Sequence, residues 1–206
     1  MTESAAPPGV EALLHRARGG AGAALGELLE AHRNYLTLLA RLQIGRRLQG
    51  KADAADVVQE TFLKAHRDFG QFRGGTEGQL VGWLRQILAL TVAYQVRHYC
   101  GTQRRDVRLE RELAAELDQS SLVLDRALVA PGSSPSEQAA RREQAVLLAD
   151  ALERLPEDYR SAIVLHHLEG LSFPEVARRM GRTLASVEKL WIRALGRLHR
   201  SLGDLS

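Results

Sequence analysis

The amino-acid sequence predicts an all-α protein made of two small helical domains joined by a flexible linker. Nearly every long segment has apolar residues at helical spacing, and no strand-like alternation persists along the 206 residues. A chain of this length suits one or two domains. A stretch of Pro, Gly and Ser at residues 131–135 separates two helical blocks, and such a stretch is typical of a flexible connection.

The composition excludes several classes of protein. The formal net charge is only +3, so basic character is local and not spread over the chain. The single cysteine, Cys100, cannot form an internal disulfide and suits a reducing cytosol. No apolar run approaches the roughly 20 residues of a membrane span, and the first residues lack the basic-then-apolar order of a signal peptide. We therefore expect a cytoplasmic protein with no membrane partner.

Shifts in composition divide the chain into four parts. The first nine residues are small, polar and rich in proline, which is typical of disorder. The parts are an extension that we expect to be partly disordered, a first helical domain, a linker that carries an acidic helix, and a second helical domain: residues 1–24, 25–105, 106–136 and 137–206.

The helix predicted at residues 53–68 has an unusual outward face. Its buried stripe is formed by Ala55, Val58, Phe62, Ala65 and Phe69. On the opposite side, Leu63 lies among carboxylates. An apolar residue in that position suggests a protein interface, but a plain surface helix with one exposed leucine fits the pattern equally well.

A glycine-rich loop follows, and aromatic residues surround it. Phe69, Phe72, Trp83 and Tyr94 are predicted to cluster near Arg73. Such a loop could accept an unstacked base by stacking and hydrogen bonding. The alternative, which the composition favours, is that these aromatics are core and the glycines form turns. In the next helix, at residues 78–99, one face is predicted to carry Gln86, Ala89, Ala93 and Arg97.

Residues 171–200 predict a helix-turn-helix, two helices joined by a tight turn at Gly181. Ser172 can cap the first helix, with Glu175 in its first turn, and Thr183 can cap the second. Gly181 supplies the permissive backbone that ends the first helix. The apolar face of the first helix consists of Leu171, Phe173, Val176, Ala177 and Met180.

The second of these helices is basic on the side that cannot be core. Its apolar stripe consists of Val187, Leu190, Trp191, Ala194 and Leu198, and the opposite side carries Ala185, Lys189, Arg193 and Gly196. Between residues 178 and 200 there are seven Lys and Arg against one Glu, a net charge of +6. DNA phosphates require this positive density. An amphipathic hairpin with a solvated basic face is the alternative, but turn, caps, stripe and charge together favour DNA binding.

The sequence contains no coherent set of catalytic or metal-binding residues. His166 and His167 are adjacent, and adjacent residues on a helix diverge by about 100°, so they do not converge on one ion. We therefore expect no catalytic residue, no metal site, no cofactor and no enzymatic activity.

Two blocks of the chain resemble conserved regions of bacterial sigma factors. DAADVVQETFLKAH at residues 53–66, with FRGG at 72–75 and WLRQIL at 83–88, resembles their second region. LERLPEDYRSAIVLHHLEGLSFPEVARRMGRTLASVEKLWIRALGRL at residues 152–198 resembles their fourth region. No recognisable third region lies between them, which is a feature of the small extracytoplasmic-function (ECF) group.

The resemblance implies a sigma factor that directs core RNA polymerase to specific promoters and aids DNA opening. The helix at 53–68 would dock on the clamp helices of the polymerase β′ subunit, and the β flap is a further implied contact on the polymerase. Promoter DNA is the other implied partner, and an anti-sigma factor is a further candidate. The implied core-polymerase contacts are Asp56, Gln59, Glu60 and Leu63.

The same resemblance assigns promoter contacts to both domains. The aromatic loop would capture a flipped base of the −10 element, and the helix after it would help open the DNA; the residues implied are Phe72, Arg73, Gly74, Thr76, Gln86 and Arg97. The helix-turn-helix would read the −35 element through Arg182, Ser186, Glu188, Lys189 and Arg193.

The chain also departs from the family pattern. Leu90 stands where Asn is frequent, and Glu188 and Leu190 stand where basic residues are frequent. The loop at 72–82 is slightly longer than usual. These differences concern the promoter sequence. Two other classes stay open: a helix-turn-helix regulator that binds duplex DNA without polymerase, and an interaction protein that mimics a sigma factor.

Overall fold

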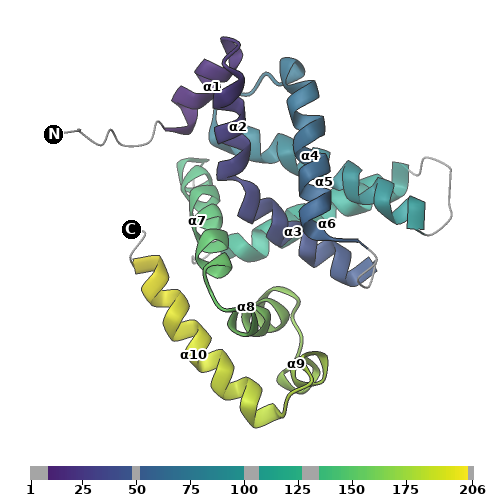
Figure 1. The fold of residues 1–206 in the computed structure, drawn as a ribbon, viewed down its shortest axis with the longest axis vertical. Coiled ribbons are helices and arrows are strands. Elements are labelled where there is room, and N and C mark those ends of the chain that lie inside the picture. The colour runs from purple at the N-terminus through teal and green to yellow at the C-terminus, as the bar shows by residue number, and fades with distance from the viewer. Residues whose placement is uncertain (1–8, 48–51, 100–106, 127–134, 204–206) are drawn as a thin grey trace. The chain divides into compact units, whose positions relative to one another are not determined.

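The structure, a computed structural model, describes residues 9–47, 52–99, 107–126 and 135–203 (Figure 1). These residues form helices and turns and contain no strand, so the all-α prediction is confirmed. The chain separates into two compact units, Met1–Leu117 and Asp118–Ser206. Across the described residues, every helix is too short or too polar to cross a membrane.

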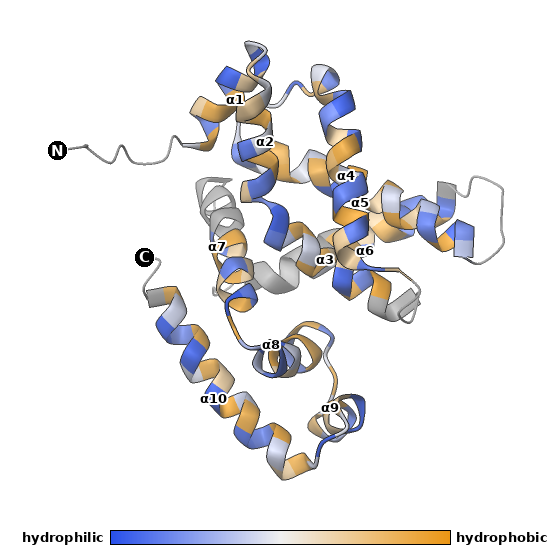
Figure 2. Cartoon of the chain, in the orientation of Figure 1, coloured by the Kyte–Doolittle hydropathy of each residue, from blue (hydrophilic) through white to orange (hydrophobic). Residues whose placement is uncertain are grey.

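The first unit is a bundle in which α4 and α5 pack against each other and against α3. Apolar residues follow the inner faces of these helices in Figure 2, and leucines such as Leu36, Leu39, Leu84 and Leu88 are fully buried. Its elements are α1 (Val10–Arg18), α2 (Gly22–Ala31), α3 (Arg33–Arg47), α4 (Ala54–Asp68), the short 3₁₀ helix η1 (Phe69–Gln71), α5 (Glu77–Tyr99) and the first part of α6 (Val107–Arg126).

The N-terminal extension, which we expected to be partly disordered, contains a helix. Within residues 1–24, the structure describes a complete helix, α1, which packs against α2 and buries Leu13 and Leu14. Residues 1–8, the proline-rich part of the extension, lie outside the described residues. The extension is therefore in large part a structural element of the first unit.

The predicted linker also contains ordered structure. Within residues 106–136, α6 is a helix of 20 residues, and its Glu110 forms an ion pair with Arg97 of α5, with Nη1 and Oε1 3.0 Å apart. Residues 127–134, which hold most of the Pro, Gly and Ser stretch, lie outside the described residues.

The second unit contains α7 (Pro135–Glu153), α8 (Glu157–Ile163), the π-helical turn η2 (Val164–Leu168), α9 (Phe173–Met180) and α10 (Leu184–Gly203). The long helix α10 packs on α7, α8 and α9. Leu165, Val176, Ala177 and Val187 form a buried cluster that joins η2, α9 and α10. Leu171, Phe173 and Met180 pack around it, so the predicted apolar face of the first helix is confirmed.

Candidate nucleic-acid interface

The helix-turn-helix has the local chemistry that its sequence predicts. The backbone N–H and the hydroxyl of Ser172 both donate to the Glu175 carboxylate, at 2.8 and 2.6 Å. These bonds lower the pKa of that carboxyl. Gly181 ends α9 in the left-handed region, at φ 62°, where glycine has no Cβ penalty. Thr183 Oγ1 accepts from the Ser186 N–H at 3.3 Å and so caps α10. The angle between the two helices is therefore fixed by sequence-encoded caps.

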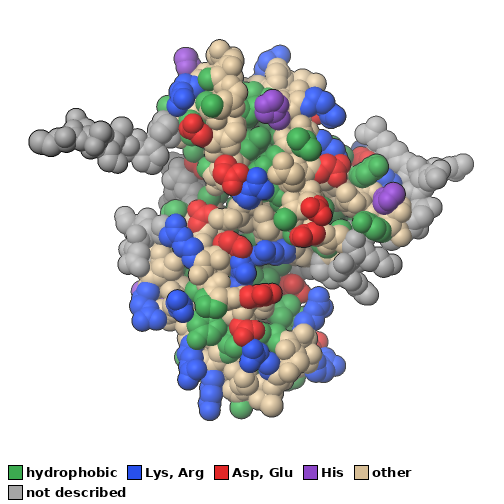
Figure 3. Space-filling model, in the orientation of Figure 1, with side chains coloured by type: hydrophobic (Ala, Val, Ile, Leu, Met, Phe, Trp, Pro, Cys, Tyr) green, Lys and Arg blue, Asp and Glu red, His purple; other side chains and the backbone are tan. Residues whose placement is uncertain are grey.

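The outer face of α10 is basic. Val187, Ala194 and Leu198 are buried, and the opposite side is exposed. In Figure 3, Lys and Arg side chains gather along the edge of the molecule where Figure 1 places α10. The exposed charged residues of this helix are Glu188, Lys189, Arg193, Arg197 and Arg200.

The predicted −35 residues do not all have the same environment. Glu188, Lys189 and Arg193 are exposed on α10, and Ser186 is half-buried at its first turn. Arg182 instead pairs with Asp158 of α8, with Nη2 and Oδ2 2.5 Å apart. A DNA contact by Arg182 would have to exchange this carboxylate for a phosphate, so the structure assigns Arg182 first to the packing of α8 against the turn.

One exposed residue of the reading helix was missed by the sequence analysis. Ile192 is 63% exposed and lies one turn after Glu188 on the outer face of α10. The angular arrangement could have found it, because Ile192 lies well away from the stripe that contains Val187. An exposed apolar side chain on this face can contact a thymine methyl group in the major groove.

A cluster of aromatic rings holds α10 against η2. His166 stacks on Phe173 at 4.1 Å between ring centroids, and its Nδ1–H donates to the Leu171 carbonyl at 2.8 Å. Trp191 of α10 donates its Nε1–H to Nε2 of His167 at 3.1 Å. The ring centroids of His166 and His167 are 5.1 Å apart, and both residues lie in the π-helical turn η2. Both rings serve packing here.

His167 makes the stability of this cluster dependent on pH. Burial, and to a smaller degree the charge of His166, lower the pKa of the His167 imidazole. The neutral ring can accept from Trp191, whereas the imidazolium cannot. The stabilisation is therefore complete above the unfolded-state pKa of about 6.5, and it is lost as the pH falls below that value toward the lower folded-state pKa.

We expect the loss of thermal stability between pH 7 and pH 5 to be smaller in His167→Gln than in the parent protein. The Gln side-chain oxygen can accept from Trp191 and does not titrate. The measurement is thermal unfolding of the full chain followed by circular dichroism. His199→Gln, at an exposed position of α10, is the control and should keep the parental pH dependence. Identical pH dependence in parent and His167→Gln would show that this hydrogen bond does not carry the effect.

Among the described residues, no group of three His, Cys, Asp or Glu side chains is placed to hold a metal ion. Cys100 lies outside those residues.

The glycine-rich loop of the first unit is built on a packed aromatic cluster. The rings of Phe69, Phe72 and Trp83 lie 5.1 to 6.2 Å apart by centroid. Phe72 is only 7% exposed, so its ring belongs to the core, as the alternative that the composition favours predicts. A buried ring shapes the loop and is not placed to stack on a base. Tyr94, which the sequence analysis grouped with these rings, lies elsewhere and is 52% exposed.

Arg18 of α1 fastens this loop from outside the aromatic cluster. Its guanidinium carbon lies 5.7 Å from the Phe72 ring centroid, and its Nη2 donates to the Gly74 carbonyl. On the other side, the Gln79 side-chain oxygen accepts from the N–H groups of Gly75, at 2.7 Å, and Thr76, at 3.3 Å. The loop is thus held in one conformation, and the side chains of Arg73 and Thr76 are exposed.

The outward face of α5 differs from the predicted one. Ala89 and Ala93 are buried, at 2% and 0% exposure, because α5 is covered on several sides. Gln86 is exposed as predicted. Arg97 is paired with Glu110 and its side chain is 16% exposed, so its assignment to DNA needs that ion pair to open. The exposed face instead carries Gln86, Leu90 and Tyr94.

The predicted polymerase-binding residues share one face of α4. Asp56 and Gln59 are exposed, and Leu63 is 64% exposed. Glu60 turns toward α5, where its carboxylate accepts from Gln95 Nε2 at 3.0 Å and pairs with Lys64 at 2.8 Å. The face therefore offers an exposed carboxylate, Asp56, and an exposed leucine two turns apart. That combination suits a protein partner with a basic and an apolar contact.

Two protein families match the chain, one in each unit. Residues 28–99 match the family described as Sigma-70 region 2, and residues 145–198 match the family described as Sigma-70, region 4. The first match contains α4, the aromatic loop and α5, and the second contains the complete helix-turn-helix.

Individual relatives match over most of their length. The ECF RNA polymerase sigma factor SigM of Mycobacterium tuberculosis is 30% identical over 183 residues, which are 89% of this chain and 79% of that protein. The ECF RNA polymerase sigma-E factor of Haemophilus influenzae is 29% identical over 184 residues, 89% of this chain and 90% of that protein. A solved structure of CnrH with the cytosolic domain of CnrY is 25% identical and covers 95% of this chain and 98% of that one, at a TM-score of 0.35.

Proposed function

Since the chain belongs to the ECF group of RNA polymerase sigma factors, we propose that its two helical units divide promoter recognition between them. Sigma factors are regulatory subunits that direct core RNA polymerase to promoters for transcription initiation. In this proposal α10 reads the −35 element, the loop at residues 72–76 with α5 reads the −10 element, and α4 binds the polymerase. In this proposal catalysis belongs to the polymerase, and the protein works in the cytoplasm together with it.

The observation that carries the proposal is the contrast between the exposed faces of α4 and α10. The α4 face presents Asp56 and Leu63, which suit a protein partner, and the α10 face presents Lys189 and Arg193, which suit phosphate and base edges. A stand-alone repressor would need only the second face. Two faces of opposite charge in one chain fit a protein that connects a polymerase to DNA.

The −35 contacts follow from the exposure of α10. Lys189 lies at the centre of the outer face and Arg193 one turn later, so both can reach phosphates or guanine. Glu188 can accept from the N4 amino group of cytosine, and Ile192 can contact a thymine methyl. We expect these two residues to shape which −35 sequence is chosen.

The −10 contacts come from the exposed parts of the loop and α5. We propose Arg73 and Thr76 on the loop, with Gln86, Leu90 and Tyr94 on α5, since these side chains are exposed. Phe72 and Gly74 act by shaping the loop, and Arg97 acts after release from Glu110. Tyr94 stacks with His98 at an interplanar angle of 10° and offers an aromatic surface for an unpaired base.

On the polymerase side, we propose that α4 binds the clamp helices of β′ and that the second unit meets the β flap. An anti-sigma factor would act most simply by covering the same face of α4. Because each unit alone offers a small surface, the tethered pair gains affinity from effective concentration once polymerase holds both at a fixed distance.

Run-off transcription with purified core polymerase and a promoter library tests the function. We expect transcripts to start at a shared promoter sequence only when the chain is added to the core enzyme. Specific binding to duplex DNA without polymerase, together with an absence of new transcripts, would instead establish a stand-alone regulator.

A further inference from the structure

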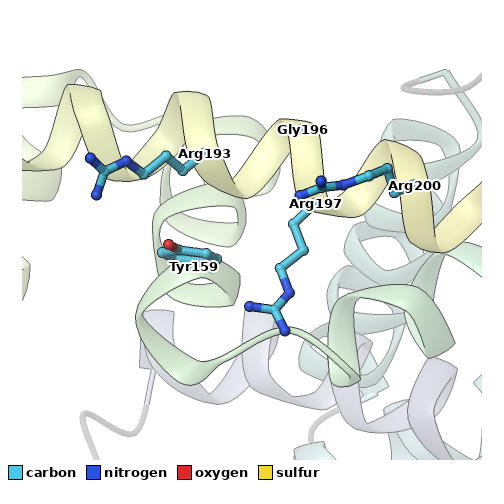
Figure 4. A pocket seen from close by; sticks show the side chains of 5 residues that line it. All are labelled: Tyr159, Arg193, Gly196, Arg197 and Arg200. Atoms are coloured by element: carbon cyan, nitrogen blue, oxygen red, sulfur yellow. The ribbon is translucent and has the colours of Figure 1, made fainter.

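A hollow of about 470 Å³ opens between α8 and the C-terminal half of α10 in the second unit (Figure 4). It lies beyond the residues assigned to reading the −35 element, except that Arg193 borders it. Its lining consists of Tyr159 from α8 and Arg193, Gly196, Arg197 and Arg200 from α10.

The hollow concentrates positive charge that has no ion-pair partner among the described residues. Among the described residues, no carboxylate forms an ion pair with Arg193, Arg197 or Arg200. Two other arginines of this unit do form ion pairs, Arg160 with Glu153 and Arg182 with Asp158. Three guanidinium groups left unpaired around one space are suited to an external anion.

Gly196 borders the hollow without a side chain. Glycine is among the least favourable residues inside a helix, yet Gly196 lies well within α10. A Cβ at this position would meet no atom within 4 Å, so packing does not require the glycine. Gly196 lies on the side of α10 opposite the buried Val187, so a ligand can approach the helix backbone closely there. Arginines lie one turn before and one turn after it.

We propose that this hollow binds a phosphate group of the DNA backbone beside the −35 element, independently of base sequence. Guanidinium groups bind phosphate oxygens bidentately, and the Tyr159 hydroxyl can donate a further hydrogen bond. In Figure 4 the hydroxyl end of Tyr159 points toward the side of the hollow where Arg193 lies. The site continues the face of α10 that carries Lys189, so it rests on the proposed −35 function and extends its footprint.

Titration of promoter binding against salt tests this site. Holoenzyme made from the full chain and core polymerase is bound to a fragment with a duplex −35 element, and to a matched fragment with that element scrambled. The double variant Arg197→Gln with Arg200→Gln should bind both fragments about ten-fold more weakly at low salt. The slope of log K against log salt should become shallower by about 0.9 for each lost phosphate contact.

Three comparison variants make the result specific. Arg154→Gln removes one charge from an exposed residue of the same unit outside the hollow, and should behave as the parent. Lys189→Ala should reduce the preference for −35 over scrambled DNA, whereas the double variant should keep that preference. Gly196→Leu should preserve or raise thermal stability, because Leu favours the helix more than Gly does. It should weaken binding to both fragments, because the Leu side chain fills the hollow.

The outcomes are distinct. The phosphate site is overturned if the double variant keeps the parental salt slope. If Lys189→Ala still loses its preference for the −35 fragment in that case, the proposed function stands. Loss of −35 preference in the double variant would make Arg197 and Arg200 base readers and also overturn the proposal. If the parent holoenzyme shows no preference for the −35 fragment, the proposed function itself fails. Pyrophosphate binding that the double variant abolishes, without any change in DNA binding, would assign the hollow to a free anion.

Discussion

Replacing Asp56 with arginine and Leu63 with aspartate is expected to abolish binding of the chain to core RNA polymerase. Both side chains are exposed on α4, and no described contact holds either of them to the rest of the first unit. Surface substitutions of this kind usually change folding stability by less than about 0.5 kcal/mol. Reversing one interfacial charge and placing another where an apolar contact belongs is expected to weaken binding by roughly 100-fold or more.

Asp56 and Leu63 are better targets than the other predicted contacts. Glu60 accepts from Gln95 of α5 and pairs with Lys64, so its replacement would also disturb the packing of α4 on α5. A loss of binding in a Glu60 variant could then come from the fold. Substitutions at Asp56 and Leu63 change the proposed interface without changing the core of the unit.

The measurement is co-purification of the full chain with core polymerase, supported by a binding titration and a thermal unfolding curve. Glu27→Arg is the matched control, because it reverses an exposed carboxylate on α2 in the same unit. It should bind as the parent does. Undiminished binding by the double variant, with an unchanged unfolding curve, would remove α4 from the polymerase interface.

Local signals in the sequence predicted the parts of the structure that depend on neighbouring residues. Ser172, Gly181 and Thr183 occupy the cap positions expected of them, because caps are formed by residues within one turn of a helix end. The stripe of α10 and the exposure of Asp56, Gln59 and Leu63 on α4 were also predicted, since each helix has one buried side. For these features the 3.6-residue period of a helix is sufficient to predict which side chains are buried. On α4 the prediction was wrong for Ala55, which is exposed, and for Glu60, which turns toward α5.

The errors arise where a residue's partner is distant in the sequence. Arg97 is paired with Glu110, and Arg182 with Asp158, and neither pairing can be read from helical periodicity. The face of α5 was mistaken at Ala89 and Ala93 because a helix covered on several sides has no single apolar stripe.

Gly74 is the position in the −10 loop where the smallest change is expected to have the largest effect. A Cβ built at Gly74 would lie 2.5 Å from Cζ of Phe72 and 2.7 Å from Cβ of Gln79. Neither neighbour can move away easily. The Phe72 ring is packed against Phe69 and Trp83, and Gln79 Cβ is fixed to the backbone of α5.

Gly74→Ala is therefore expected to displace the loop at residues 72–76. Displacement would break the hydrogen bond from Arg18 to the Gly74 carbonyl and those from Gly75 and Thr76 to Gln79. Overpacking of this kind typically costs 1–3 kcal/mol. If that cost falls on the conformation that accepts the −10 base, promoter opening should decrease by roughly 10- to 100-fold, while binding of the −35 duplex by the other unit should stay unchanged.

Gly75 supplies the matched control, because a Cβ at Gly75 would meet no atom within 4 Å. Permanganate reactivity of the −10 thymines in holoenzyme complexes measures opening, and Gly75→Ala should leave it close to the parental level. Opening by Gly74→Ala at the parental rate would mean that this loop does not receive the −10 base. If Gly74→Ala and Gly75→Ala reduce promoter opening equally, the promoter requires backbone flexibility of the glycine pair. The shape that Phe72 imposes on the loop would then not be the decisive property.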